Sequence, residues 1–268
     1  MTHKMTIEPK VTIIIPCYNR EKYIGETLEC VQHINYDNFE CIIVDNNSTD
    51  NSAKEIQKFI QGKDRFRLIH QDVNNISIAR NKAIAASSGE FILPLDSDDL
   101  IHPDYVREAA KILQNNPGIV VVTCDAVLFG AKKGKWKRPE YNFKDFLVKV
   151  SIHNSSMYRR ADYDKTNGYE PELRYCEDWE FWINLLKRGG EVYKIRKNYL
   201  FYRRHKDSTQ RKYRSTDENK FVTKFIYEKH KELYASLLEN PLELLQQHQK
   251  YKKGYNQLRR LTFRKPLP

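Results

Sequence analysis

The sequence predicts an α/β fold in which helices cover both faces of a mostly parallel sheet. Two observations lead to this prediction. Short, β-branched apolar runs alternate with segments of helical periodicity, and polar turn residues follow the runs. The 268 residues are 40% hydrophobic and 30% charged, which is enough for a packed core. No apolar run approaches the roughly 18 residues that a membrane span needs.

The first hundred residues alternate strand and helix in a regular order. Residues 11–15 (VTIII) form a β-branched run that ends at Pro16 and predicts a strand buried on both faces. The turn sequence NNSTDN offers a helix N-cap before residue 52, and Gly89 closes the helix that precedes it. The spacing predicts strands at 39–45, 65–71 and 90–96, and helices at 25–33, 52–60 and 76–88.

The second half is less regular, and its elements are predicted one by one. Gly189-Gly190 stops a strongly amphipathic helix, and the segment KKGKWKRPEYNF (132–143) is predicted as a loop. The remaining expectations are helices at 104–114, 178–188, 214–236 and 241–260, and strands at 118–129, 191–197 and 198–204.

The net charge of +11 is concentrated at the end of the chain. Residues 206–268 hold 15 Lys and Arg against 7 Asp and Glu, and no acidic residue follows Leu244. Such a segment attracts anions, and its aromatic and leucine residues suit a helix lying on anionic lipid. A solvated helix and a partner-docking surface are the alternatives. Nucleic-acid binding is not expected, because the rest of the chain is nearly balanced and its expected cleft is acidic.

Two features of the sequence, its five scattered cysteines and its N-terminal segment, indicate the cellular compartment of the protein. The cysteines are odd in number and never form C-x-x-C, which argues against a zinc site and a disulfide framework. The segment MTHKMTIEPK lacks the apolar middle of a secretory signal. We therefore expect a cytoplasmic protein.

Polar residues gather where the predicted strands end, which is where ligands bind in an open parallel sheet. The first strand is followed by CYNR, the second by DNNS and the fourth by DSDD. The chain contains neither G-x-G-x-x-G nor G-x-x-x-x-G-K-[ST], so dinucleotide and P-loop sites lose their main support. The three carboxylates at 96–99 repel one another unless a cation screens them, and oxygen ligands favour Mg²⁺ or Mn²⁺. An Asp-rich turn that caps a helix is the alternative.

Five motifs together resemble the family 2 glycosyltransferases, which have the GT-A fold. In chain order they are VTIIIPCYNR, IIVDNNSTD, ARNKAI, LDSDD and EDWEFW, spanning residues 11 to about 188. The resemblance implies a Rossmann-like sheet in a catalytic domain at 1–205. Residues 1–100 would form its nucleotide-sugar-binding half and 101–205 its acceptor-binding half, with a basic helical extension at 206–268.

The resemblance also implies which side chains meet the nucleotide. They are Pro16, Tyr18, Asn19, Asp45, Asn46, Arg80, Asp96 and Ser97. Many members carry a second acidic residue where this chain has Asn46, and an amide donates as well as accepts, which weakens the expectation of uridine. A solvated helix arginine is the alternative for Arg80.

The D-x-D motif implies Asp98 as a metal ligand for Mn²⁺ or Mg²⁺, with Asp99 supporting it. A histidine in the Y-R-x-H context, here His205, adds a ligand in some members; a lone surface histidine is the alternative. Asp178 is implied as the general base, with Glu177 and Trp179 facing the acceptor. A helix N-cap with first-turn acids would explain the same residues without catalysis.

The expected activity is therefore an inverting, metal-assisted transfer of a sugar from a nucleotide-sugar, expected to be a UDP-sugar. The expected acceptor is a hydroxyl of a glycan or of a lipid-diphosphate-linked molecule, in the making of a bacterial polysaccharide. Peripheral contact with the inner face of the membrane would follow from the basic tail. A non-catalytic GT-A-like protein that binds nucleotide or glycan is the alternative. Nucleotidyl transfer is not expected, since PCYNREKY is not a loop rich in glycine and lysine.

Overall fold

The computed structural model describes residues 8–205 and 216–237. Contacts divide the chain into two compact units, Met1–Val222 and Thr223–Pro268. The division predicted between 205 and 206, and the two halves predicted within 1–205, stay predictions.

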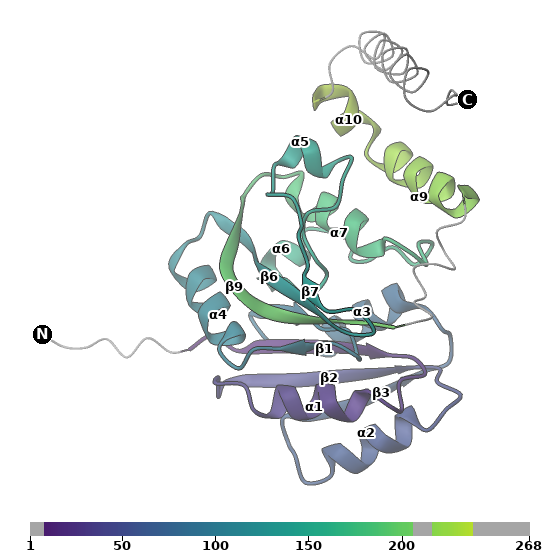
Figure 1. Cartoon of the computed structure of the whole chain (residues 1–268). Helices are drawn as coiled ribbons and strands as arrows, with labels where there is room; N and C mark the ends of the chain where they lie inside the picture. The colour runs from purple at the N-terminus through teal and green to yellow at the C-terminus, as the bar shows by residue number, and fades with distance from the viewer. Residues whose placement is uncertain (1–7, 206–215, 238–268) are drawn as a thin grey trace, which may run out of the picture. The chain divides into compact units, whose positions relative to one another are not determined.

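A single nine-stranded sheet forms the frame of the first unit (Figure 1). Its order is β3-β2-β1-β4-β8-β6-β9-β5, with β7 paired to β6. Neighbours among β1 to β4 are parallel, β8 is antiparallel to both β4 and β6, and β6 and β9 are parallel. The strands β6 and β9 therefore run in the same direction as β1 to β4. The bounds are β1 Val11–Cys17, β2 Phe39–Asn46, β3 Phe66–Gln71, β4 Phe91–Pro94, β5 Leu100–Ile101, β6 Ile119–Gly130, β7 Gly134–Lys135, β8 Met157–Arg159 and β9 Glu191–Arg204.

Helices cover both faces of this sheet, as predicted. All seven residues of β1 are buried, because alternate side chains enter two different packing layers. Val11, Ile13 and Ile15 belong to one core together with residues of α1, α2 and α4, whereas α3 contacts β1 and β2 from the other side (Figure 1). The bounds are α1 Ile24–Gln32, α2 Ser52–Ile60, α3 Ile76–Ala85, α4 Tyr105–Asn115, α5 Phe143–Phe146, α6 Arg160–Tyr163 and α7 Glu177–Leu186.

The structure differs from the prediction mainly in the second half. The two strands expected at 191–197 and 198–204 are one strand, β9, which passes their junction by a register shift. Cys124 pairs with Ile195, but the next residue of β6 pairs with Asn198. The short strands β5 and β8 were not predicted, and the expected loop at 132–143 contains β7 and the first residue of α5.

Helices α9 (Thr216–Lys229) and α10 (Lys231–Leu237) stand where one helix was predicted at 214–236. The helix predicted at 241–260 lies outside the described residues. Within the described ranges, no helix is both long and apolar enough to cross a membrane.

Candidate active site

The carboxyl ends of four strands meet at one edge of the sheet, and the site is built there. Segments after β1, β2 and β4 carry the predicted polar residues, and β9 ends at Arg204, directly before His205. Among the described residues, three non-glycine residues have a left-handed backbone: Asn19 (φ 50°), Asn47 (φ 64°) and Cys176 (φ 58°). They follow β1, follow β2 and precede α7. Such strain clusters at functional sites, where the surrounding structure enforces it.

Asp98 lies in a compact cluster of opposite charges. Its Oδ2 accepts a hydrogen bond from Arg20 Nε at 2.8 Å and lies 2.8 Å from His205 Nε2. Burial acts to raise the pKa of Asp98, but the His205 hydrogen bond and the Arg20 charge outweigh it and lower that pKa. The side chain of His205 is only 24% exposed, so it is not a lone surface histidine.

Arg203 holds the same turn from the end of β9. Its backbone N–H donates to Asp99 Oδ1 at 2.7 Å, and its Nε donates to the Asp98 carbonyl at 2.7 Å. The expected supporting role of Asp99 therefore takes the form of a tie between the DSDD turn and β9.

Arg80 connects the two acidic parts of the site. Its guanidinium pairs with Glu177 Oε1 at 2.5 Å and with Asp96 Oδ1 at 3.2 Å, and it lies 5.2 Å from the centroid of the Tyr169 ring. The residue is 2% exposed, so the alternative of a solvated helix arginine is wrong. Burial acts to lower the pKa of Arg80, but Glu177 and Asp96 outweigh it and raise that pKa.

Asp178 has the proton affinity that a general base needs near neutral pH. Burial raises its pKa from 3.8 to about 6, and the charges of Glu177 and Asp96 act in the same direction. Cys176 is the N-cap residue of α7 and makes no side-chain capping bond, so Asp178 lies in the first helical turn and is not the cap. One of its oxygens accepts the Trp179 backbone N–H at 2.9 Å.

The other residues expected around the nucleotide lie at the ends of β1 and β2, except Ser97, which follows β4. Tyr18 is 39% exposed, whereas Pro16 and Ser97 are buried, and Asn19 joins the β2 loop through Ser48. Asp45 lies 3.3 Å from the ring nitrogen Nδ1 of His70.

Asn46 is already engaged with the protein. Its carbonyl oxygen accepts from Gln71 Nε2 at 2.7 Å and from the Asn75 backbone at 2.8 Å, and its Nδ2 donates to Asn74. It thereby ties β2 to the loop before α3. Only its second amide hydrogen has no partner among the described residues.

Of the tryptophans near Asp178, Trp182 is fully buried and packs in the core. Trp179 is half-buried, and its Nε1 donates to the Phe146 carbonyl at 2.9 Å. It therefore lies at the junction between α7 and α5.

Two contacts of this site were not predicted. Asn154 Nδ2 donates to Asp96 Oδ1 at 3.0 Å from the loop before β8, and Arg20 was noted only as part of its motif. Asn154 gave no sequence signal, because its position depends on a long connection with no motif. Arg20 could have been found as the cation that follows the first strand.

The donor set of Asp98 and His205 fits a divalent metal with few protein ligands. A carboxylate oxygen and an imidazole nitrogen are both ligand types that Mn²⁺ accepts, and here the two atoms pair directly with each other. Within 8–205 and 216–237, no group of three or more His, Cys, Asp or Glu side chains is arranged around one such point. A metal held by this pair would keep positions for phosphate oxygens and water.

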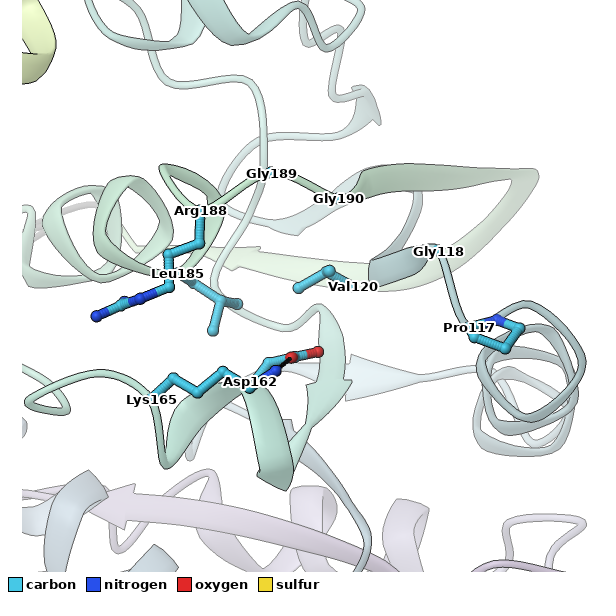
Figure 2. A pocket seen from close by; sticks show the side chains of 9 residues that line it. All are labelled: Pro117, Gly118, Val120, Asp162, Lys165, Leu185, Arg188, Gly189 and Gly190. Carbon is cyan, nitrogen blue, oxygen red and sulfur yellow. Dashed lines mark hydrogen bonds and ion pairs between the residues drawn. The ribbon is translucent and has the colours of Figure 1, made fainter.

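The first unit also contains a separate cavity of about 240 Å³. Figure 2 shows the side chains that line it. Gly118 and Gly190, in its wall, directly precede β6 and β9, so it lies at the amino ends of strands whose carboxyl ends face the site. It is lined by Pro117, Gly118, Val120, Asp162, Lys165, Leu185, Arg188, Gly189 and Gly190. None of these was predicted as a site residue.

Known structures share this architecture. TarS of S. aureus, solved in complex with UDP-GlcNAc, superposes with a TM-score of 0.67 at 22% identity, covering 80% of this chain and 64% of that one. The mannosyltransferase PcManGT of Pyrobaculum calidifontis, in complex with GDP-Man and Mn²⁺, superposes with a TM-score of 0.62 at 17% identity, covering 97% and 84%. These likenesses confirm the predicted GT-A fold.

Sequence comparison gives the family. The Bacillus subtilis (strain 168) protein named "Putative glycosyltransferase EpsH" is 28% identical over 221 residues, which are 76% of this chain but only 64% of EpsH. The chain thus spans less than two thirds of the length of that relative. The model of "Glycosyl transferase family 2" matches residues 12–174, which contain the nucleotide-side motifs and the DSDD turn. With the GT-A sheet and these motifs at its carboxyl edge, the chain belongs to glycosyl transferase family 2.

Proposed function

We propose that this chain transfers a sugar from a UDP-sugar to a hydroxyl group of a glycan or lipid-linked acceptor, with inversion at the anomeric carbon. The observation that carries the proposal is the pairing of Arg80 with both Asp96 and Glu177. Because Asp178 follows Glu177, the pairing brings the donor-side carboxylates and the expected base into one cluster. The UDP-GlcNAc bound to TarS supports the choice of donor.

In the proposed reaction, Asp178 takes the proton of the acceptor hydroxyl while the oxygen of that hydroxyl attacks the anomeric carbon. The bond from that carbon to the diphosphate breaks, and the electron pair leaves with the nucleoside diphosphate. An alcohol is a poor nucleophile at neutral pH, and a carboxylate whose pKa lies near 6 is suited to remove its proton. Attack from the face opposite the leaving group inverts the configuration.

Arg20 and Arg203 flank Asp98 and would stabilise the charge that develops on the departing diphosphate. Asp98 and His205 would hold Mn²⁺ or Mg²⁺. A bound divalent ion would neutralise part of the diphosphate charge. The Mn²⁺ in the PcManGT complex supports this assignment.

The test is release of UDP from UDP-sugars with Mn²⁺ present, comparing the wild type with Asp178→Asn. We expect release by the wild type and a rate about 10²- to 10⁴-fold lower for the variant. Asp64→Asn, which changes an exposed carboxylate after α2, is the matched control and should behave as wild type. Stabilisation by UDP-sugars without any release would instead identify the non-catalytic binding protein.

The proposal includes contact between the basic tail and anionic lipid at the cytoplasmic face of the membrane. The supporting observation is the absence of acidic residues after Leu244, next to repeated Lys, Arg and aromatic residues. Sedimentation with anionic and neutral vesicles tests it. Binding only to anionic vesicles, lost at about 1 M salt, is expected.

A further inference from the structure

The segment 132–138 (KKGKWKR), which contains β7, is strongly basic and pairs with β6. Five of its seven residues are Lys or Arg, and its four lysines are exposed. Trp136 fixes the segment to the sheet: its backbone N–H donates to the Ala126 carbonyl at 2.9 Å, and its ring lies 4.3 Å from that of Tyr202. The basic groups are therefore presented by an anchored segment.

Arg138 is the one cation of this segment that is half-buried. Its guanidinium carbon lies 4.1 Å from the centroid of the Trp136 ring, and its Nη1 donates to the Ile152 carbonyl at 3.3 Å. Its Nε is buried and has no hydrogen-bond partner among the described residues. A guanidinium stays charged in proteins, and removing such a charge from water without an anionic partner is costly.

The contacts of Arg138 lead toward the expected base. Its Nη1 donates to the Ile152 carbonyl, and Asn154, two residues further on, donates to Asp96. Arg80 in turn joins Asp96 to Glu177, the neighbour of Asp178.

The charge of Arg138 acts to lower the pKa of Asp178. The charge of Asp178 acts to raise the pKa of Arg138, although burial lowers that pKa by more. The cations beside Asp98, by contrast, are Arg20 and Arg203. The charge of Arg138 is therefore available on the side where the acceptor hydroxyl must enter.

We infer that Arg138 binds an oxyanion of the acceptor, a phosphate or a carboxylate, close to the hydroxyl that Asp178 deprotonates. This inference rests on the proposed function and narrows it to an acidic acceptor. The planar fork of a guanidinium matches both kinds of oxyanion. The exposed lysines at 132–137 would attract the same acceptor over a longer range. A neutral glycan would leave the guanidinium with only the Trp136 ring, the Ile152 carbonyl and the charge of Asp178 around it.

The test follows the indole ¹H–¹⁵N signals during titration with inorganic phosphate. The chain has three tryptophans, and Trp136→Phe assigns the signal of the indole that stacks on Arg138. We expect this signal to shift in the wild type, and the Kd for phosphate to rise about tenfold or more in Arg138→Gln. Lys137→Gln, the matched control, removes the same charge from the adjacent exposed position and should leave the Kd within about twofold.

Equal weakening by the two glutamine variants would overturn the inference, because it would show general attraction to a basic surface. Lack of any phosphate-dependent shift would overturn it too. If Arg138→Gln does not fold, Arg138→Lys serves in its place, since it keeps the charge but loses the fork; an unchanged Kd for it would count against the inference.

Further probes separate the sources of the oxyanion. Tighter binding of a short-chain prenyl diphosphate than of dimethyl phosphate or glucuronate supports a lipid-diphosphate acceptor, and the reverse order supports an acidic glycan. UDP with Mn²⁺ is titrated separately. Failure of UDP to bind would contradict the proposed function, whereas the phosphate result concerns Arg138 alone.

Discussion

Asp178→Asn should inactivate the enzyme and also make it more stable above pH 6. Burial, with help from Glu177 and Asp96, raises the pKa of Asp178 from 3.8 to about 6. A raised carboxyl pKa means that the folded state favours the protonated form. The protonated carboxyl therefore stabilises the folded state fully below pH 3.8, the pKa that Asp178 has in the unfolded chain. This stabilisation is lost as the pH rises through about 6.

The size of the effect follows from this shift. It is about two pKa units, and one unit corresponds to about 1.4 kcal/mol, so the ionised carboxylate costs up to about 3 kcal/mol above pH 7. An uncharged amide of the same size removes this cost. For a domain of this size, each 1 kcal/mol shifts Tm by about 2–4 °C.

The assay combines urea unfolding at pH 5 and pH 8 with UDP release. We expect the variant to gain stability mainly at pH 8, and the kcat/KM of the wild type to fall about tenfold per pH unit below 6. Asp64→Asn should change neither property. A variant that is less stable than the wild type at pH 8, or one that keeps more than a tenth of wild-type turnover, would refute the reasoning.

Three further predictions concern the frame of the site. Arg80→Met should lower the free energy of unfolding by about 3–5 kcal/mol, because it leaves Asp96 and Glu177 without their buried cation. A loss below about 1 kcal/mol in urea unfolding would contradict the pairing of Arg80 with both carboxylates. Gly89→Ala should destabilise by about 1–3 kcal/mol, since a Cβ there would lie 2.5 Å from a backbone nitrogen of β1; Gly25→Ala, with open space around it, should instead be neutral or stabilising in the same thermal melts. His205→Asn should raise the Mn²⁺ concentration needed for half-maximal stabilisation with UDP by about tenfold or more, and an unchanged value would remove His205 from the metal site.

The regular first half of the fold could be predicted from the sequence because its signals are local. Each strand there is a short β-branched run, and each helix has its own start or stop residue. The strands β5 and β8 could not be predicted, because two or three residues carry no periodicity and pair only through distant neighbours. Likewise, two strands were expected at 191–197 and 198–204, whereas pairing with β6 carries one strand through both.

The site shows the same limit. Motif positions predicted which residues gather at the sheet edge, but they did not predict the partners of these residues. Arg80 was expected at the nucleotide, and the structure pairs it with two carboxylates from opposite ends of the motif set. Asn154 and Arg138 had no signal, because they come from long connections without a motif and meet their partners, Asp96 and the Ile152 carbonyl, only in the folded chain.

The bridge made by Arg80 also limits how this chain can be recombined with its relatives. A chimera joined near residue 100 would take the guanidinium and Asp96 from one parent and Glu177 from the other. Unless Arg80, Asp96 and Glu177 have the same relative positions in both parents, the chimera would lack one of the two ion pairs of Arg80. Exchanges intended to change acceptor choice are therefore better confined to the connection between β6 and β8, which leaves these three residues intact.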